Sequence, residues 1–311
     1  MKAPTQCECG SVRLMRGHLP NERDGSPNPD ARRAHFVNNR LTLRVIFVRG
    51  LMGTSEETSK SIARGSLEPM GQLRGASNGS LLCRDDSGDL FVYKPVSGES
   101  PLWDFARDTL CRREVAAANL DRLLGWDLVP PTRWTDEGPM GPGMVQKWVE
   151  EVDELRPVNI FDTHNVPIGW LSILQAIDQD GSAVTLAHEP SEQLARMSLF
   201  DAVVNNADRK AGHVLADKNG RVFGIDHGVC FHEEPKLRTV LWGWVDTQIP
   251  PKLLRDLTGL GSELGNFHPQ IDPFLSETES VELRGRIAEL VHTEAFPRPS
   301  AQWPAIPWPV F

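Results

Sequence analysis

Two aspartates in the second half of the chain could serve phosphoryl transfer. Asp208 lies in the stretch Asn206-Ala-Asp-Arg-Lys-Ala-Gly-His213, and Asp226 follows 18 positions later in Gly224-Ile-Asp-His-Gly228. In this chemistry one carboxylate orients the attacking hydroxyl, and a second holds a divalent metal against the nucleotide phosphates. Because Asp-x-Gly is also an ordinary turn, the pair needs support from residues elsewhere in the chain.

A lysine and a glutamate upstream give that support. Lys94 ends an apolar run, and strand alternation places it on the same face as Leu90 and Val92, toward a cleft. Glu114 stands 20 residues later on a predicted helix whose inner face is otherwise apolar. A pair between Lys94 and Glu114 would compensate both charges and direct the ammonium at a phosphate. Taken singly, each residue is equally compatible with a position in solvent.

A glycine-rich turn precedes the lysine. Small residues let backbone amides approach phosphate oxygens, so nucleotide contacts are expected from this turn at Gly75, Ser77, Gly79 and Ser80. Glycine turns are common, so this turn supports a nucleotide site only in combination with the residues that follow it in the chain. Glycine turn, lysine, glutamate and the two aspartates follow one another in the order expected for ATP chemistry, at compatible spacings.

Short strands and one helix would position the first half of this set. Antiparallel strands joined by tight turns are expected at residues 72–76, 80–84 and 90–94. Apolar side chains at helical spacing predict a helix over 111–124, and Gly125 ends it. An extended segment at 129–134 and a buried strand at 143–149 complete this part.

The second half reads as mainly helical. The acidic region 150–195 is expected to be helical and to shape access for the phosphoryl acceptor. An amphipathic helix over 193–204 runs directly into the first aspartate. A hairpin of 214–216 and 221–225 carries the two acidic sites at its ends, and later helices are expected at 253–257 and 279–292.

These elements predict an α+β protein of two lobes, with a small antiparallel sheet in the N-lobe over 67–149 and a mainly helical C-lobe over 150–295. Residues 1–66 are expected to be a disordered or non-native extension, with Met52 as an alternative start. The proline-rich residues 296–311 are expected to form an extended or disordered tail.

Composition excludes several classes of protein. The net charge of -9 argues against a general nucleic-acid or anionic-membrane binder, since both favour a basic surface. No run approaches the roughly 20 apolar residues that cross a bilayer. Five scattered cysteines form no disulfide framework, and no secretory signal is evident, so we expect a cytoplasmic protein.

Several stretches, taken together, resemble the phosphatidylinositol 3-/4-kinase-like superfamily. They are Val92-Tyr-Lys-Pro95, Arg113-Glu-Val-Ala-Ala-Ala118, Leu123-Leu-Gly125, Val129-Pro-Pro-Thr132, Met144-Val-Gln146, Ala207-Asp-Arg209 and Ile225-Asp-His-Gly228. The chain is most similar to compact bacterial members of actinobacterial type and to type II phosphatidylinositol 4-kinases. The resemblance spans roughly residues 68 to 290 and implies that the two lobes, 67–149 and 150–295, have a protein-kinase-like fold. It is specific as a combination, although no single stretch is.

The resemblance implies a role for each matching residue. Lys94 looks like the phosphate-contacting lysine and Glu114 like its helix partner. Residues 144–149 look like the hinge beside adenine, where Gln146 and Trp148 would contact the nucleotide. In the Asp-Arg pair, Asp208 looks like the catalytic aspartate and Arg209 like a second catalytic residue beside it, whereas Asp226 looks like the metal ligand. ATP and Mg²⁺ or Mn²⁺ are the implied cofactors.

The chain departs from the family at His213. The family usually has an asparagine five residues after the catalytic aspartate, as a second metal ligand, and here a histidine stands there. Imidazole binds Mg²⁺ poorly and Mn²⁺ better. His213 is therefore open to three interpretations: a metal ligand, a base, or a mark of weakened catalysis.

These observations predict a kinase that transfers the γ-phosphoryl group of ATP to a hydroxyl. The acceptor is open between a protein serine or threonine, a small molecule and a lipid head group. Two alternatives remain: a nucleotide-binding pseudokinase, which His213 favours, and another ATP-dependent transfer, such as nucleotidyl transfer, on the same fold. The oligomeric state is not predicted.

Overall fold

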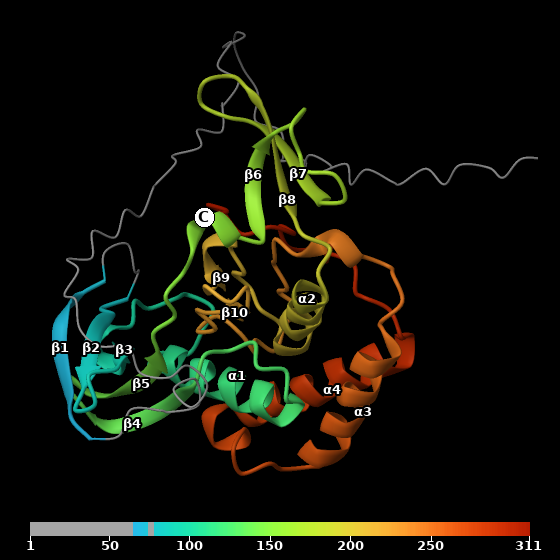
Figure 1. Cartoon of the computed structure of the whole chain (residues 1–311). Coiled ribbons are helices and arrows are strands. Elements are labelled where there is room, and N and C mark those ends of the chain that lie inside the picture. Colours follow the sequence, from blue (N-terminus) through green and yellow to red (C-terminus); the bar gives the residue numbers. More distant parts are fainter. Residues whose placement is uncertain (1–64, 74–77) are drawn as a thin grey trace, which may run out of the picture. The chain divides into compact units, whose positions relative to one another are not determined.

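The computed structural model describes residues 65–73 and 78–311 and shows an α+β protein with an antiparallel sheet in its N-terminal part and a mainly helical C-terminal part (Figure 1). The predicted N-terminal extension lies outside these residues, apart from Gly65 and Ser66. Two of the predicted nucleotide contacts, Gly75 and Ser77, also lie outside them. No helix among the described residues is long and apolar enough to cross a membrane.

A five-stranded antiparallel sheet forms the N-terminal lobe. Its strand order is β1-β2-β3-β5-β4, and the strands are β1 (Leu67–Gln72), β2 (Leu81–Asp85), β3 (Leu90–Pro95), β4 (Thr132–Gly138) and β5 (Gly141–Lys147). Strand β3 alternates strictly, so that Phe91 and Tyr93 are fully buried while Lys94 lies on the opposite face. The first strand differs from the prediction, because β1 ends at Gln72, where we expected a strand to begin; residues 74–76 of the predicted strand lie outside the described residues.

Helix α1 (Leu110–Leu124) packs against β4 and β5. Its first amides are not capped by the adjacent Thr109. They are bound by the Glu99 carboxylate, which accepts from the amides of Leu110 at 3.1 Å and Cys111 at 2.7 Å. An anion is stabilised there because it faces the positive end of the helix dipole. At the other end Gly125 adopts φ 64, a left-handed conformation that ends the helix at low cost, as predicted.

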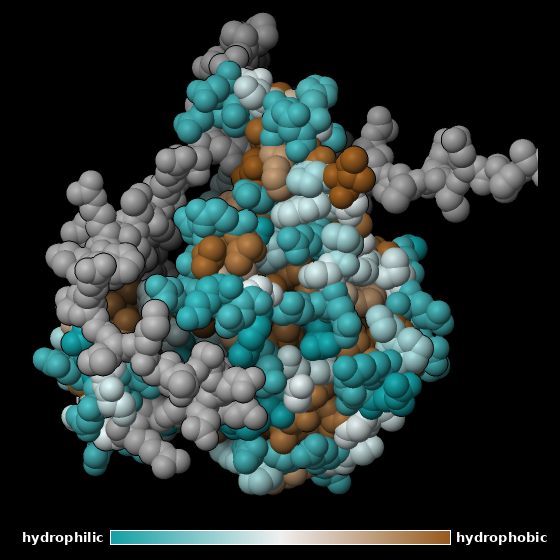
Figure 2. Space-filling view, in the orientation of Figure 1, coloured by the Kyte–Doolittle hydropathy of each residue, from teal (hydrophilic) through white to brown (hydrophobic). Residues whose placement is uncertain are grey.

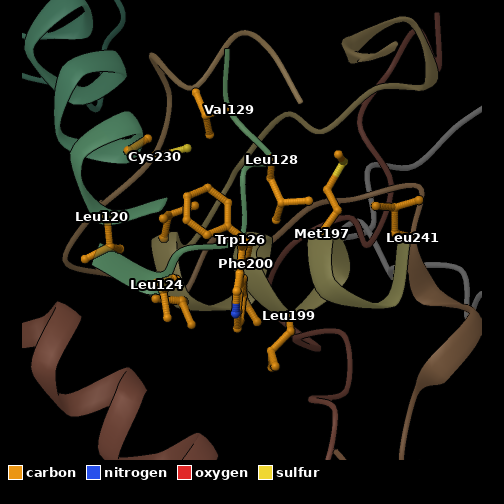
Figure 3. Packing of buried hydrophobic residues seen from close by; sticks show 14 of the residues in the cluster. Leu120, Leu124, Trp126, Leu128, Val129, Met197, Leu199, Phe200, Cys230 and Leu241 are labelled. Carbon is orange, nitrogen blue, oxygen red and sulfur yellow. The ribbon is translucent and has the colours of Figure 1, made fainter. Parts of the chain in front are cut away.

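The C-terminal lobe is built on three helices and a short hairpin. They are α2 (Glu192–Val204), β9 (Val214–Ala216), β10 (Val222–Gly224), α3 (Pro251–Leu264) and α4 (Glu277–Thr293). These elements match the helices and hairpin predicted from the sequence. Apolar side chains from α1 and α2 meet in the main core, among them Leu120, Leu124, Met197 and Phe200 (Figure 3).

The region 158–188 is a sheet, contrary to the helical prediction. It contains β6 (Val158–Asp162), β7 (Leu171–Ile177) and β8 (Ala183–His188) in the order β6-β8-β7. β-Branched and aromatic residues in these three short segments outweigh the acidic composition that we took for a solvated helix. Hydrophobic residues gather on this part of the surface (Figure 2), where Ile168 and Ile177 are exposed.

The proline-rich residues after α4 are extended and packed against the C-terminal lobe. Phe296, Pro307 and Val310 are buried, and Trp244 stacks on Phe296. Of the two predicted states of this tail, extended and disordered, the structure shows the extended one.

A buried histidine at the end of β8 makes stability depend on pH. His188 is fully buried, its Nδ1–H donates to the Glu189 carbonyl, and its Nε2 accepts from the Gly243 amide. Burial lowers the pKa of His188 to about 4, so between about pH 6.5 and pH 4 the unfolded chain binds more protons than the folded one. Above about pH 6.5 neutral His188 therefore costs the folded state nothing. As the pH drops to 4, we expect the free energy of unfolding to fall by roughly 3 kcal/mol because of this one residue.

Urea unfolding at pH 7 and pH 5, compared between the wild type and His188→Gln, measures this contribution. Glutamine retains an acceptor for the Gly243 amide but does not titrate, so the variant should lose less stability on acidification. An equal loss in both proteins would contradict the assignment.

Candidate active site

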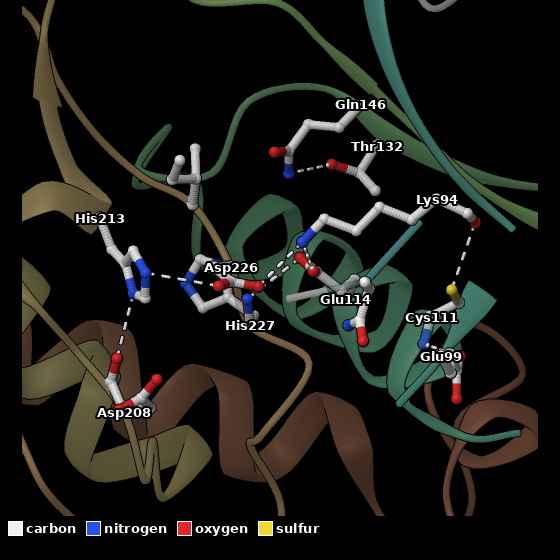
Figure 4. Close-up of polar contacts among 12 residues, drawn as sticks. Lys94, Glu99, Cys111, Glu114, Thr132, Gln146, Asp208, His213, Asp226 and His227 are labelled. Atoms are coloured by element: carbon white, nitrogen blue, oxygen red, sulfur yellow. Dashed lines mark hydrogen bonds and ion pairs between the residues drawn. The ribbon is translucent and has the colours of Figure 1, made fainter. Parts of the chain in front are cut away.

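Lys94 lies between two carboxylates from distant parts of the chain (Figure 4). Its Nζ donates to Glu114 Oε1 at 2.5 Å and to Asp226 Oδ1 at 2.8 Å. The predicted pair of Lys94 and Glu114 is therefore confirmed as a contact. Strand β3, helix α1 and the end of the β9–β10 hairpin meet at this ammonium group, so one ion-pair network connects both lobes.

Local backbone geometry explains why these groups converge. Glu114 is 1 % exposed, and its second oxygen, Oε2, accepts from the His227 amide at 3.0 Å. Asp226 follows β10 and adopts φ 61, a left-handed conformation that aspartate and asparagine tolerate better than most residues. The sharp turn at Asp226 directs its carboxylate toward Lys94 and not along the strand.

The charged groups in this network shift one another's pKa values. Burial alone would lower the pKa of Lys94, but Asp226 and Glu114 outweigh it and hold that pKa above the ordinary value. Lys94 in turn holds the pKa of the Asp226 carboxyl well below its usual range. Lys94 therefore stays a cation and Asp226 stays an anion throughout the physiological pH range.

Asp208 lies in the loop that follows α2, and a second cation accompanies it. Lys210 Nζ lies 3.1 Å from Asp208 Oδ2. Burial raises the pKa of Asp208, while Lys210 opposes that effect. A raised pKa favours a carboxylate that must accept a proton. Lys210 was missed in the sequence analysis, although its place two residues after Asp208 was a usable signal.

Arg209 is fully buried in the middle of the same loop. Its guanidinium is 3.0 Å from Asp201 Oδ1 and donates to the carbonyl of Ile225 at 2.8 Å and of His213 at 3.3 Å. It also contacts His227 Nε2 at 2.7 Å. Arg209 thus binds the loop of Asp208 to the loop of Asp226, which is a positioning role, and no part of it is accessible to a substrate.

His213 and Asp226 form an arrangement that suits a cation. His213 Nδ1 donates to the Asp208 carbonyl at 3.0 Å, which leaves the lone pair on Nε2. Nε2 faces Asp226 Oδ2 at 3.4 Å. Burial lowers the pKa of His213 to about 4, so the imidazole is neutral near pH 7. In this tautomer Nε2 and Oδ2 are both acceptors, and a cation between them could bind to both.

The chain would supply only part of a metal coordination sphere. Across residues 65–73 and 78–311, no three or more histidine, cysteine, aspartate or glutamate side chains form a group that could hold a metal ion alone. His213 and Asp226 would therefore provide two ligands, and phosphate oxygens and water the others. Mg²⁺ is commonly bound in this way, through one or two protein ligands together with substrate phosphates.

The predicted nucleotide contacts that the structure describes lie in or next to the sheet of the N-terminal lobe. The Gly79 amide donates to the Gly98 carbonyl at 3.1 Å, and Ser80 Oγ is buried without a hydrogen-bond partner. Gln146 on β5 is buried and donates to Thr132 Oγ1 at 2.9 Å. Trp148, just beyond β5, is half-buried, and its amide donates to the Leu90 carbonyl. Of these residues, Figure 4 shows Gln146 near the Lys94 network.

Sequence comparisons identify related proteins. The family "Phosphatidylinositol 3- and 4-kinase" matches residues 186–268. Protein Rv2133c of Mycobacterium tuberculosis is 42% identical over 265 residues, which cover 80% of this chain and 94% of that protein. Phosphatidylinositol 4-kinase gamma 3 of Arabidopsis thaliana is 24% identical over 251 residues, which cover 69% of this chain. The match spans 43% of the Arabidopsis protein, so the chain corresponds to less than half of it.

Solved kinase structures are more distant. The Helicobacter pylori proinflammatory kinase CtkA is 14% identical, with a TM-score of 0.39 over 75% of this chain and 94% of that chain. The Golgi casein kinase with Mn/ADP bound is 14% identical, with a TM-score of 0.43 over 76% of this chain and 73% of that chain.

Proposed function

This chain belongs to the phosphatidylinositol 3-/4-kinase-like superfamily, and from that premise we propose that it transfers the γ-phosphoryl group of ATP to a hydroxyl group. The observation that supports the proposal best is the ion-pair network of Lys94, Glu114 and Asp226. It joins a cation suited to phosphate with a carboxylate suited to a metal, and the Asp208 loop lies beside it.

Each residue of the site has a part in this reaction. Asp208 accepts the proton of the acceptor hydroxyl, whose oxygen then bonds to the γ-phosphorus as the bond to the β–γ bridging oxygen breaks. ADP leaves with that bonding pair. Lys94 binds and orients the phosphates, and Glu114 fixes the position of Lys94. Lys210, beside Asp208, balances negative charge near the transferred group.

His213 and Asp226 are the residues that would hold a divalent ion. A Mg²⁺ or Mn²⁺ ion supplies charge neutralisation on the phosphate oxygens. Gly75, Ser77, Gly79 and Ser80 are the proposed contacts to the phosphates, and Gln146 and Trp148 are the proposed contacts to adenine. The buried Ser80 Oγ without a partner is consistent with a ligand at that position.

Calorimetric titration of the full chain with ATP, in Mg²⁺ and separately in Mn²⁺, tests the nucleotide site. We expect binding that depends on the metal, followed by turnover to ADP when the acceptor is present. Product mass then distinguishes phosphoryl transfer from nucleotidyl transfer. A well-folded protein that binds no ATP with either metal would refute the proposal, and binding without any turnover would support the pseudokinase alternative.

The acceptor class is proposed only as a hydroxyl-bearing molecule: a protein serine or threonine, a soluble metabolite or a lipid head group. Parallel assays with radiolabelled ATP on proteins, polar metabolites and lipid vesicles separate these three. We also propose that the protein acts in the cytoplasm. The described cysteines Cys83, Cys111 and Cys230 are free thiols, which fits a reducing compartment.

The histidine at position 213 should determine metal preference. His213→Asn replaces imidazole with the amide oxygen that the family usually presents, and oxygen ligands favour Mg²⁺. We expect the ratio of the Mn²⁺ to the Mg²⁺ affinity to fall in this variant, measured by titration of each metal in the presence of ADP. An unchanged ratio would exclude His213 as a ligand. His292→Asn is the matched control, because His292 lies on α4 away from the site.

A further inference from the structure

The last residues of the chain run along the loop that contains Asp208. We call residues 206–213 the catalytic loop and residues 303–311 the C-terminal strap. After α4, the chain pairs with the segment before α3, where Gln248 forms a bridge with Ala295, and then reaches the catalytic loop. Three sets of contacts hold the strap: two of them reach the catalytic loop or its supporting segment, and the third reaches the loop between β3 and α1.

The first contact fixes the catalytic loop itself. The Ala211 amide donates to the Val310 carbonyl at 2.7 Å, and both side chains are buried in the main core. At the next position, a Cβ on Gly212 would lie 4.0 Å from Phe311 Cα, so the two backbones pass close to each other. Ala211 begins the short helix Ala211–His213 and directly follows Lys210. The strap therefore holds the backbone between Lys210 and His213.

The second contact reaches the loop through a neighbouring segment. The Ala305 carbonyl accepts from the Thr239 amide at 3.1 Å and from Trp242 Nε1 at 2.8 Å. Thr239 forms a parallel bridge with Arg209, and its hydroxyl donates to Asp201 Oδ2 at 3.0 Å. The strap thus supports the same Asp201 carboxylate that pairs with Arg209.

The third contact is a buried cation in an aromatic environment. Lys236 is 2 % exposed, with its Nζ 4.6 Å from the centre of the Trp303 ring and 5.1 Å from that of Trp103. It forms an ion pair with Asp104 at 2.7 Å. Lys236 thereby joins the strap to the loop between β3 and α1, and the contact between cation and aromatic rings is favourable when water is excluded.

We propose that the C-terminal strap is a positioning element of the active site, which holds Lys210 and His213 in register with Asp226. The name of the catalytic loop rests on the proposed function, but the contacts do not. Ala211 lies one residue from Lys210 and two from His213, so a displaced strap releases both side chains. Lys94 and Glu114 are held by other elements and keep their places.

Hydrogen exchange of the full chain without nucleotide tests the proposal directly. Val310→Asp places a charge in the core and should displace the strap, whereas Ala301→Asp adds the same charge at an exposed position and serves as the control. We expect exchange in peptides covering 206–213 to rise about three- to tenfold in Val310→Asp, as the loss of one backbone hydrogen bond implies. Exchange in α1 should not change.

A second variant removes the hydrogen bond without adding a charge. Ala211→Pro deletes the donor to Val310, and the site suits proline because it is the first position of a helical turn and Lys210 before it is extended, with φ -85 and ψ 162. It should raise exchange in the strap and in the catalytic loop together. Val310→Ile is the conservative counterpart of Val310→Asp. It keeps an apolar side chain at the core position, so its catalytic loop should exchange as slowly as in the wild type.

Binding of Mn²⁺ in the presence of ADP gives a readout that a purely structural role would not change. Because His213 is held through Ala211, Val310→Asp should weaken Mn²⁺ binding roughly tenfold, the scale seen when support around a metal ligand is lost. Unchanged exchange in residues 206–213, or an equal rise in α3, would reject the proposal. If the wild type binds no Mn²⁺, the proposed metal site fails, while the exchange data still decide the role of the strap.

Discussion

Asp226→Asn is expected to reduce phosphoryl transfer by roughly 10²- to 10⁴-fold, because a bound divalent ion contributes several kcal/mol of charge stabilisation in the transition state. Asparagine is the informative replacement at this position. Asp226 adopts φ 61, which asparagine tolerates and alanine does not. The substitution therefore removes the charge while the turn is kept.

The same substitution separates the metal site from the lysine site. Without the Asp226 charge, Lys94 keeps its bond to Glu114 Oε1 at 2.5 Å, so the ATP binding that remains should no longer depend on the metal. Calorimetry with and without Mn²⁺, together with rates of ADP formation, measures both effects. The matched control is Asp217→Asn in the β9–β10 turn, where the side chain accepts from the amides of Asn219 and Arg221. A variant at position 226 with wild-type rate and metal dependence would refute the metal assignment.

Local patterns in the sequence were enough to predict the elements that hold the site. Strand alternation placed Lys94 on the cleft side of β3, and helical spacing placed Glu114 on the inner face of α1. Their contact follows from these two local facts together with the cost of an unpaired buried charge. Prolines and turn residues marked where the elements end, so the β9–β10 hairpin and the helices of the second lobe were also found.

The sheet of β6, β7 and β8 was missed because its signal conflicts with composition. Acidic residues suggested a solvated helix, but Val158–Asp162 and Ala183–His188 pair in register, and such pairing depends on partners more than 20 positions apart. The tail was ambiguous for a similar reason. Five prolines exclude a helix there but do not reveal that Val310 would reach the core.

The role of Arg209 also required the three-dimensional structure. The resemblance placed Arg209 among the catalytic residues because it stands beside Asp208, whereas the structure buries its side chain completely. Its partner Asp201 lies eight positions earlier on α2, in a stretch that reads only as an amphipathic helix. No pattern in the sequence indicates that this aspartate points inward, because buried charges are found from their partners and not from their neighbours in the chain.

Asp201→Asn should cost about 3–5 kcal/mol of the free energy of unfolding, the largest stability effect that we expect in this protein. Asp201 and Arg209 are both 0 % exposed, so the variant leaves a guanidinium charge without a counter-ion in the core. Total stability of a folded protein is only about 5–15 kcal/mol. The midpoint of thermal unfolding should therefore fall by about 10 °C or more.

A double-mutant cycle distinguishes this pair from its surroundings. Arg209→Gln removes the stranded charge, so the double variant with Asp201→Asn should be less destabilised than the sum of the two single variants. The exposed pair of Asp246 and Arg298 is the control, and Asp246→Asn should leave the midpoint unchanged. Additive effects at 201 and 209 would mean that the pair does not act as a unit. Because Arg209 also binds the carbonyls of His213 and Ile225, loss of the pair should weaken Mn²⁺ binding at temperatures where the protein remains folded.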